Sequence, residues 1–285
     1  MHVEVNGTRL WFDVDGAVRV PVGPDMHQRP TVVLLHGGPG SFDHTYLKPD
    51  FHRLTEVAQV VYLDLRDHGR SAWGDPKKWT YEVCADDVRA FCDALGIAKP
   101  VLYGHSLGGF IAMLYGVRHP GHASALILDS TAGRFDVPRM VESYRTIAGD
   151  QVAATVARVY GGDSVLPEEW APCWKLFGPR LPVRSRVTVN APLNAHYLPL
   201  MGRFNALRQL SRIQCPTLVC RGSLDPAITR EVGRELVAAL PSHLVQFEEI
   251  EGAGHFPWMD APERYWPMLT EFVASSGTPE AAARI

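Results

Sequence analysis

Short apolar runs alternate along the chain with longer segments that carry apolar residues at helical spacing. Residues 31–36 and 57–65 are nearly continuous apolar runs, as expected of strands buried on both faces of a sheet. Residues 81–95 instead repeat apolar side chains with a helical period and are followed by Gly96, a common helix stop. Repeated strand–helix–strand units predict a mostly parallel sheet covered by helices on both faces. The same patterns predict strands at 100–103, 125–129, 217–221 and 244–250, and helices at 107–118, 229–240 and 261–275.

The two ends of the chain lie outside this alternation. Residues 3–5 and 10–14 are strand-like and flank Asn6-Gly7, a pair that favours a tight hairpin turn. These two strands bring the predicted sheet to eight strands. The alanine-rich tail after Gly277 carries no such pattern, and we expect it to be frayed.

The alternation is interrupted between residues 133 and 211. This segment is helix-like and rich in aromatic residues, and prolines divide its second half into short pieces. A structureless loop of that length is implausible inside a compact domain. An independent second domain is the alternative, but the strand–helix pattern resumes directly afterwards. We therefore predict a core formed by residues 1–132 and 212–285, with residues 133–211 inserted as a helical lid.

The pentapeptide Gly-His-Ser-Leu-Gly at 104–108 matches the pattern G-x-S-x-G. By composition alone, about one chain in ten of this length would contain that pattern. Here it follows a predicted strand and opens an apolar helix, the setting that a nucleophile elbow requires. Its glycines suit a tight turn, which lifts Ser106 to the sheet edge where ligands of such folds bind. We predict Ser106 as a nucleophile; a purely structural turn is the alternative.

A second glycine-rich loop, His-Gly-Gly-Pro-Gly at 36–40, follows an earlier strand. Acyl transfer builds negative charge on the carbonyl oxygen of the substrate, so N–H donors must point at that oxygen. We expect one donor to be the backbone N–H of Leu107 and the other that of Gly38, because Pro39 lacks an N–H. A plain turn is the alternative for this loop.

A serine nucleophile also needs a base that is oriented by a carboxylate. His255 follows the last predicted strand and should emerge at the same sheet edge as Ser106, whereas His243 precedes that strand. Asp225 follows the preceding strand, so the order serine, acid, histidine is the one found in such folds. We predict a triad of Ser106, Asp225 and His255, with Asp129 as the alternative acid.

Five motifs in this order resemble those of α/β-hydrolases: the 36–40 loop, the segment DLRDHGRS at 64–71, GHSLGG, GSLDP and GAGH. The resemblance covers nearly the whole chain outside the lid and implies the α/β-hydrolase fold. The first two motifs are particularly similar to those of proline iminopeptidases. That branch removes an N-terminal proline from peptides, and its relatives include amidases and esterases.

The chain departs from the proline iminopeptidase pattern at two positions. Leu107 stands where those peptidases usually have a tryptophan, and Asn194 stands where they have a glutamate that binds the free amine of the substrate. A neutral amide does not offset the desolvation of an ammonium group as a carboxylate does. Glu142, Glu168 and Glu169 are other acids of the lid, but they fit solvated helix positions. The sequence therefore favours an ester, lactone or amide of a small apolar substrate over a peptide.

Aromatic side chains of the lid are candidates for the substrate pocket. Trp170, Trp174 and Tyr197 could line an apolar site, with Asn194 beside them, although the aromatic residues suit the core of the lid equally well. We predict that Trp170, Asn194 and Tyr197 contact the substrate.

Composition excludes several other classes of function. The net charge is −3 without a basic cluster, so nucleic acid is not expected as a partner. Neither a signal peptide nor a membrane-spanning run is recognisable, and the five cysteines form no C-x-x-C pair, so we expect a cytoplasmic protein that acts on a small molecule. No metal-ligand spacing is evident, and acyl transfer needs no cofactor. A non-catalytic ligand-binding protein remains the competing class, and the oligomeric state leaves no signal in the sequence.

Overall fold

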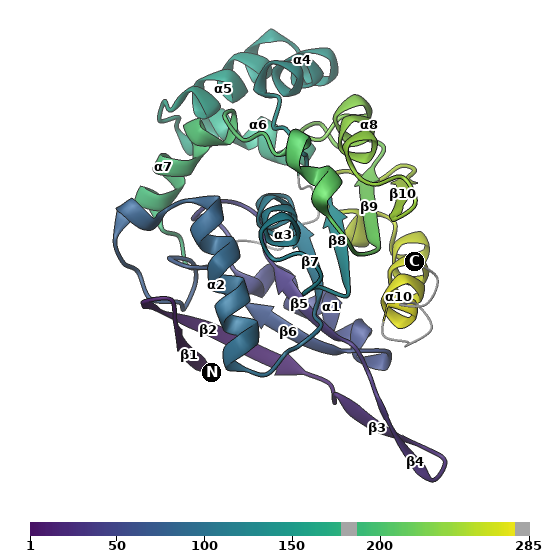
Figure 1. The fold of residues 1–285 in the computed structure, drawn as a ribbon. Helices are drawn as coiled ribbons and strands as arrows, with labels where there is room; N and C mark the ends of the chain where they lie inside the picture. Colours follow the sequence, from purple (N-terminus) through teal and green to yellow (C-terminus); the bar gives the residue numbers. More distant parts are fainter. Residues whose placement is uncertain (178–186, 277–285) are drawn as a thin grey trace.

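The computed structural model describes residues 1–177 and 187–276 of the chain. One sheet contains β1 (His2–Val5), β2 (Thr8–Asp15), β5 (Thr31–Leu35), β6 (Gln59–Leu63), β7 (Val101–His105), β8 (Ala125–Asp129), β9 (Thr217–Gly222) and β10 (Val245–Ile250). The order across it is β1-β2-β6-β5-β7-β8-β9-β10 (Figure 1). In this order, neighbouring strands from β6 to β10 are parallel to one another. β2 runs antiparallel to both of its neighbours, β1 and β6. The predicted fold class is confirmed. The tail after Gly277 lies outside the described residues.

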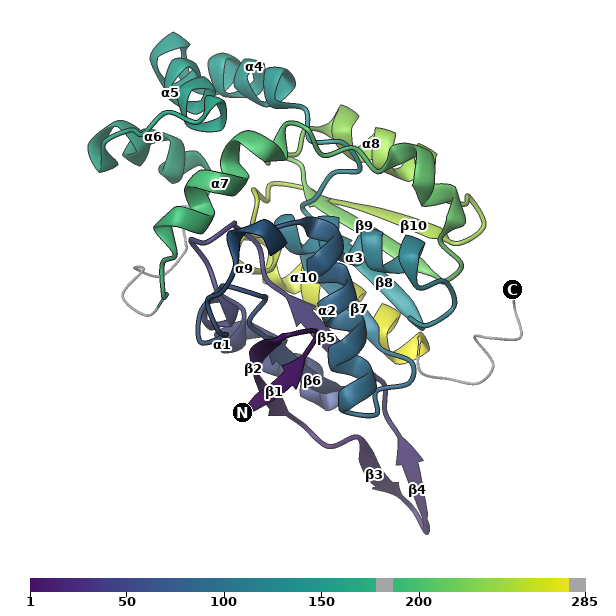
Figure 2. The same ribbon diagram turned by 60° about the vertical axis from the view of Figure 1, so that its left-hand side comes forward.

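Helices cover both faces of the sheet (Figure 2). One face carries α2 (Tyr81–Ala94), α3 (Leu107–Arg118) and α8 (Arg230–Ala239), and the other carries α1 (Lys48–Phe51), α9 (Pro257–Asp260) and α10 (Pro262–Ser275). Alternate residues of a strand therefore join two separate apolar cores: Val33 and Leu35 of β5 join the first, and Val32 and Leu34 the second. Because every residue of β5, β7 and β8 is buried, these strands are mostly apolar, and the buried polar residues His105 and Asp129 stand at the carboxyl ends of β7 and β8.

Two antiparallel hairpins precede the parallel strands. β1 and β2 pair around Asn6 and Gly7, which both have positive φ, as the predicted tight turn requires. The sequence did not predict the second hairpin, β3 (Arg19–Val22) with β4 (Asp25–Gln28), which projects from the body of the molecule (Figures 1 and 2). Most of its residues are exposed, so no buried apolar pattern marks it in the sequence.

Between β8 and β9, the residues that the structure describes are mostly helical. The helices are α4 (Val137–Ala148), α5 (Asp150–Gly161), α6 (Pro167–Phe177) and α7 (Ala191–Met201), followed by the short 3₁₀ helix η4 (Leu207–Arg212). In both ribbon views α4 to α7 lie together on one side of the molecule, beyond the ends of the parallel strands (Figures 1 and 2). Among the described residues, none of the helices is long and apolar enough to span a membrane.

A buried ion pair joins the DLRDHGRS segment to α2. Arg66 donates from Nε and Nη2 to the two carboxylate oxygens of Asp87, at 2.6 and 2.7 Å, and Asn6 of the first hairpin donates to the same carboxylate at 2.7 Å. The side chains of Arg66 and Asp87 are 4% and 2% exposed, so water does not screen the pair. The pair therefore connects three segments that lie far apart in the sequence.

Removing one partner of this pair should destabilise the fold. Asp87→Ala leaves the guanidinium of Arg66 buried without its carboxylate, which we expect to lower the free energy of unfolding by about 3–5 kcal/mol. Asp93→Ala is a matched control on the same helix, since Asp93 pairs with Arg89 at the surface and such pairs contribute about 0.2–1 kcal/mol. Urea denaturation measures both variants. Equal losses would contradict the buried role of Asp87.

Candidate active site

Ser106 occupies the sharp turn between β7 and α3. Its backbone has φ +53° and ψ −115°, a conformation that non-glycine residues rarely adopt. Two hydrogen bonds hold this turn: the N–H of Ser106 donates to the carbonyl of Asp129 at 2.9 Å, and Thr131 Oγ1 donates to the carbonyl of Ser106 at 2.7 Å. The turn is therefore stabilised by the end of the neighbouring strand β8.

The glycines beside Ser106 allow the backbone to pack closely. A Cβ atom at Gly104 would lie 2.4 Å from the carbonyl oxygen of Gly108, and one at Gly108 would lie 2.1 Å from the carbonyl oxygen of Leu35. Neither contact is possible for a real side chain. Glycine at these positions lets α3 begin directly against β5 and β7.

His255 and Asp225 meet at the same sheet edge as Ser106. Asp225 lies in the loop after β9 and His255 in the loop after β10, and Nδ1 of His255 lies 2.7 Å from Oδ2 of Asp225. The other oxygen of Asp225 accepts the N–H groups of Ala227 and Ile228, at 2.8 and 3.1 Å. Because a carboxylate only accepts hydrogen bonds, the network assigns the proton of a neutral His255 to Nδ1, which leaves Nε2 as the basic nitrogen.

Nε2 of His255 is buried and has no hydrogen-bond partner among the residues that the structure describes. The ring of Phe177, the last residue of α6, stacks on the imidazole with ring centroids 4.1 Å apart and 29° between the planes. Ser106 and His255 line the same cavity, but Ser106 is not hydrogen-bonded to Nε2 in this conformation. Such bonds often form only when substrate is present.

The two competing residues from the sequence lie elsewhere. The carboxyl group of Asp129 accepts hydrogen bonds from the hydroxyls of Tyr103 and Tyr265, both at 2.6 Å, and burial raises its pKa. Asp129 therefore belongs to a separate hydrogen-bond network, whereas His255 pairs with Asp225. His243 is exposed and precedes β10, on the opposite edge of the sheet.

The 36–40 loop is held by His36. Its Nδ1 donates to the carbonyl of Gly37 at 2.9 Å, and its Nε2 accepts the N–H of Leu65 at 3.2 Å. In a trans peptide the N–H points opposite to the carbonyl, so this bond orients the N–H of Gly38, a residue that lines the cavity. Gly38 has φ +58°, which favours glycine. Leu107 begins α3, where N–H groups have no acceptor within the helix.

His68 holds the other end of the same loop, a role that sequence reasoning did not assign. Its Nε2 accepts the N–H of Gly40 at 2.9 Å, and its Nδ1 donates to the carbonyl of Arg66 at 2.7 Å. Burial lowers the pKa of His68 to about 3, so the ring is neutral. The DLRDHGRS motif was a signal in the sequence, but its spacing does not reveal which side chain reaches the loop.

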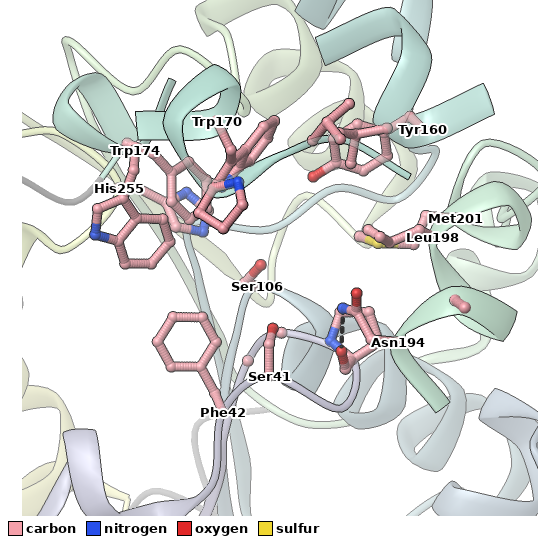
Figure 3. Close-up of a pocket in the computed structure, with 18 of the residues that line it drawn as sticks. Ser41, Phe42, Ser106, Tyr160, Trp170, Trp174, Asn194, Leu198, Met201 and His255 are labelled. Atoms are coloured by element: carbon pink, nitrogen blue, oxygen red, sulfur yellow. Dashed lines mark hydrogen bonds between the residues drawn. The ribbon is translucent and has the colours of Figure 1, made fainter. Parts of the chain in front are cut away.

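A cavity of about 970 Å³ opens around Ser106. Figure 3 places His255, Trp170 and Trp174 on one side of Ser106, and Ser41, Phe42 and Asn194 on the other. Its walls are mostly aromatic and aliphatic, and the charged residues among its described lining are Asp163 and Lys175. The remaining apolar walls come from α4, α5 and α7 and include Tyr144, Val159, Tyr160, Leu198 and Met201.

The structure brings two of the three predicted substrate contacts to this cavity. Trp170 and Asn194 line it, but Tyr197 does not. Tyr197 is buried, its ring lies 5.1 Å from that of Tyr81, and its hydroxyl lies 3.9 Å from Sγ of Cys84. It faces the core because it lies on the side of α7 that packs against α2.

Asn194 joins α7 to the 36–40 loop. Its Nδ2 donates to the carbonyl of Pro39 at 2.6 Å (Figure 3). One turn earlier, the N–H of Asn190 donates to the carbonyl of Gly40 at 2.7 Å. The lid acids considered from the sequence do not line the cavity: Glu142 pairs with Arg145, Glu169 pairs with Arg158, and Glu168 is exposed.

One cluster within the described residues gathers groups of the kind that bind metal ions, namely Asp43, His44 and Asp64. Its atoms are already hydrogen-bonded: Asp64 Oδ1 accepts from Nδ1 of His44 at 2.7 Å, Asp64 Oδ2 accepts the N–H of Arg70, and Asp43 accepts the N–H of Thr45. These bonds use the oxygens that a metal ion would need. The cluster fits a structural role beside the 36–40 loop.

Comparisons with known proteins place the chain in a family. A profile described as the alpha/beta hydrolase fold matches residues 30–262, so the chain belongs to the α/β-hydrolase family, as its motifs predicted. It is 27% identical to a proline iminopeptidase of Lactobacillus helveticus (strain DPC 4571) over 280 residues, which cover 86% of this chain and 90% of that protein. It is also 33% identical to the proline iminopeptidase PfmaB of Pestalotiopsis fici over 132 residues, but these cover only 46% of this chain and 43% of that protein.

Among solved structures, a thermophilic esterase from Thermogutta terrifontis resembles the chain with a TM-score of 0.72. The two are 26% identical, and the match covers 98% of this chain and 100% of the esterase. The named relatives are hydrolases, and they include both peptidases and an esterase.

Acidification should weaken the fold through His68. The folded protein keeps this ring neutral down to a pH of about 3, whereas an unfolded histidine binds a proton near pH 6.5. The stabilisation is therefore complete above pH 6.5 and is lost as the pH falls toward 3, by at most about 1.4 kcal/mol per pH unit. His68→Gln removes the titrating imidazole, while the side-chain amide oxygen can still accept the N–H of Gly40.

Urea denaturation at pH 7, 6 and 5 tests this expectation. The free energy of unfolding should fall less steeply with acidification in His68→Gln than in the wild type. His243→Gln, at an exposed position, is the matched control and should keep the wild-type slope. Parallel slopes for all three proteins would contradict the prediction.

Proposed function

We propose that the protein is a serine hydrolase that cleaves an ester, lactone or amide of an apolar substrate through an acyl-enzyme. The observation that carries the proposal is the state of His255, which is paired with Asp225 through Nδ1. Its Nε2 is buried and has no hydrogen-bond partner among the described residues, and His255 lines the same cavity as Ser106. A basic nitrogen buried without a partner is costly in a purely structural site. The strained backbone of Ser106 further supports a nucleophile at this position.

In the proposed reaction, Oγ of Ser106 attacks the carbonyl carbon of the substrate. Nε2 of His255 accepts the hydroxyl proton, and the carboxylate of Asp225 stabilises the resulting imidazolium and fixes its orientation. The tetrahedral intermediate then expels the leaving group, which takes that proton from Nε2. A water molecule, activated by the same nitrogen, hydrolyses the acyl-enzyme and restores Ser106.

The negative charge of the intermediate requires preorganised donors. The backbone N–H groups of Gly38 and Leu107 are the proposed pair, supported by the His36 bond that orients the Gly37–Gly38 peptide and by the position of Leu107 at the start of α3. Donors of this kind typically contribute about 10²–10³-fold each to the rate of acyl transfer.

The substrate is proposed to bind beneath a lid formed by residues 133–211, against Trp170 and Asn194. The cavity is large enough for a drug-sized molecule, at the upper end of the usual range of about 300–1,000 Å³. Its apolar walls favour a substrate with a substantial hydrocarbon or aromatic part.

A prolyl aminopeptidase is the second candidate, because proline iminopeptidases are among the similar proteins. Such a substrate carries a free amine, which needs an anionic partner once it leaves water. Asp163 is the carboxylate among the described cavity residues, but it is exposed and lies 3.9 Å from Nε of Arg158. The amide of Asn194 is already bonded to Pro39. These contacts favour the ester, lactone or amide substrate.

Replacing Ser106 by alanine should abolish turnover without changing the fold. The rate constant kcat should fall by at least about 10³-fold, because the nucleophile is removed while the donors and the binding cavity remain. Labelling by a fluorophosphonate probe should be lost as well. Ser124→Ala, before β8 at the opposite sheet edge, is a matched control that should hydrolyse and label like the wild type. If Ser106→Ala hydrolysed the substrate at the wild-type rate, the assignment of Ser106 would be refuted.

Comparison of two chromogenic substrates should separate the candidate functions. We expect a short-chain p-nitrophenyl ester to give a higher kcat/KM than proline p-nitroanilide. The physical reason is the uncompensated desolvation of the prolyl amine in this cavity, whereas the ester carries no charge. Faster release from the proline arylamide would instead establish the aminopeptidase.

A further inference from the structure

A chain of hydrogen bonds connects the three loops of the site. The N–H of Gly37 donates to the hydroxyl of Tyr46 at 2.7 Å, that hydroxyl lies 2.9 Å from Nδ1 of His105, and Nε2 of His105 lies 2.9 Å from the backbone carbonyl of His255. Gly37 belongs to the 36–40 loop, His105 directly precedes Ser106, and His255 belongs to the loop after β10. The chain therefore runs from the proposed oxyanion donors to the proposed base.

We propose that Tyr46 and His105 are positioning residues, which hold the 36–40 loop, the Ser106 turn and the His255 loop in the mutual arrangement that acyl transfer needs. This inference rests on the proposed function. Neither residue belongs to the proposed triad or supplies a proposed oxyanion donor. Tyr46 and His105 act through Gly37 and His255 and take no part in bond making.

The direction of the three bonds follows from the groups at the ends of the chain. The N–H of Gly37 can only donate and the carbonyl of His255 can only accept, so Nε2 of His105 carries the proton and Nδ1 accepts from Tyr46. The Tyr46 hydroxyl then accepts from Gly37 and donates to His105, and each ring nitrogen of His105 has a single role. Burial lowers the pKa of His105 and raises that of Tyr46, which keeps both groups neutral, as this arrangement requires.

The 36–40 loop packs so closely on the Ser106 turn that no side chain fits between them at Gly37. A Cβ atom at Gly37 would lie 2.9 Å from Nδ1 of His105 and 3.1 Å from Cβ of Ser106, so the backbone of the loop packs directly on the turn. Gly37 is fixed on both sides, by Tyr46 at its N–H and by His36 at its carbonyl. The two peptides that flank Gly37 are thereby each held by one hydrogen bond: Tyr46 holds the peptide with His36, and His36 holds the peptide with Gly38.

Aromatic packing fixes the two rings of the chain. Tyr46 and His105 are 4% and 1% exposed. The ring of Trp258 lies 4.9 Å from that of His105 and 6.2 Å from that of Tyr46, and the ring of His255 lies 4.9 Å from that of His105. The rings therefore have little freedom to form other hydrogen bonds. Since a displacement of 1 Å in an active site can cost about 10²-fold in rate, this rigidity has a catalytic consequence.

Tyr46→Phe is the primary test, because it keeps the ring and removes both bonds of the hydroxyl. We expect kcat for a p-nitrophenyl ester to fall on the order of 10-fold or more while KM changes by less than about 2-fold, since the loss affects the arrangement of the reacting groups more than binding. The rate of fluorophosphonate labelling should fall in parallel. The free energy of unfolding is measured alongside.

Tyr115→Phe is the matched control. Tyr115 is also buried and its hydroxyl is also bonded to a histidine, Nδ1 of His122, but the pair lies at the far end of α3. This variant loses a bond of the same kind and should keep wild-type kcat. If Tyr46→Phe also keeps wild-type kcat, and is altered only in stability, the bonds are merely structural and the proposal is overturned.

His105 provides a second, independent test. His105→Gln retains a side-chain N–H that can reach the carbonyl of His255, whereas His105→Leu retains no polar group. We expect kcat in the order wild type, His105→Gln, His105→Leu. The double variant Tyr46→Phe/His105→Gln should lose about as much as the more impaired single variant, because both changes break one chain.

Equal kcat in His105→Gln and His105→Leu would overturn the proposal, and these two single variants decide the question if Tyr46→Phe does not fold. Losses that multiply in the double variant would overturn the proposal as well. A wild-type protein that is neither active on esters nor labelled at Ser106 would refute the proposed function itself. Normal kcat in Tyr46→Phe, with an inactive Ser106→Ala, would refute only the role of the hydrogen-bond chain.

Discussion

The close approach of α3 to the sheet is the constraint on which the rest of the site depends. Gly104 and Gly108 let the helix begin against β5 and β7, where any side chain would overlap backbone atoms. This contact forces the strained turn at Ser106 and brings the 36–40 loop, which follows β5, onto the same turn. The loops after β9 and β10 reach the same edge because these strands run parallel to β7. The sheet topology thus brings four separated segments of the sequence together at one edge.

The parts of the molecule that could be predicted are those with a physical pattern in the sequence. Strands buried on both faces have mostly apolar runs, such as β5 and β9. Polar residues in the loops after parallel strands were expected at one edge of the sheet, and the structure places Asp225 and His255 2.7 Å apart there. The hairpin β3–β4 was missed because its residues are mostly exposed and alternate in no apolar pattern. Tyr46 and His68 were missed for another reason: their hydrogen bonds span 9 and 28 residues, and no local spacing encodes which side chain reaches a loop.

Tyr197 shows the limit of assigning a pocket from composition. An aromatic residue in a helical segment has a core face and a cavity face available to it, and the sequence of α7 is apolar nearly all around. Only the packing of α7 against α2 decides that Tyr197 faces Tyr81 while Asn194 faces the cavity. The family, by contrast, is recognisable because its motifs are short sequences at the ends of strands, and the alpha/beta hydrolase profile matches residues 30–262.

The bond from Asn194 to Pro39 also bears on how substrate preference can change during evolution. The side chain that lines the cavity at position 194 is simultaneously a donor to the loop that carries Gly38. A glutamate there, as in the proline iminopeptidase pattern, has no N–H to donate when ionised and would leave the carbonyl of Pro39 without this partner. Position 194 therefore couples the wall of the cavity to the loop that carries Gly38. A substitution there alters the polarity of the cavity and the support of that loop at the same time.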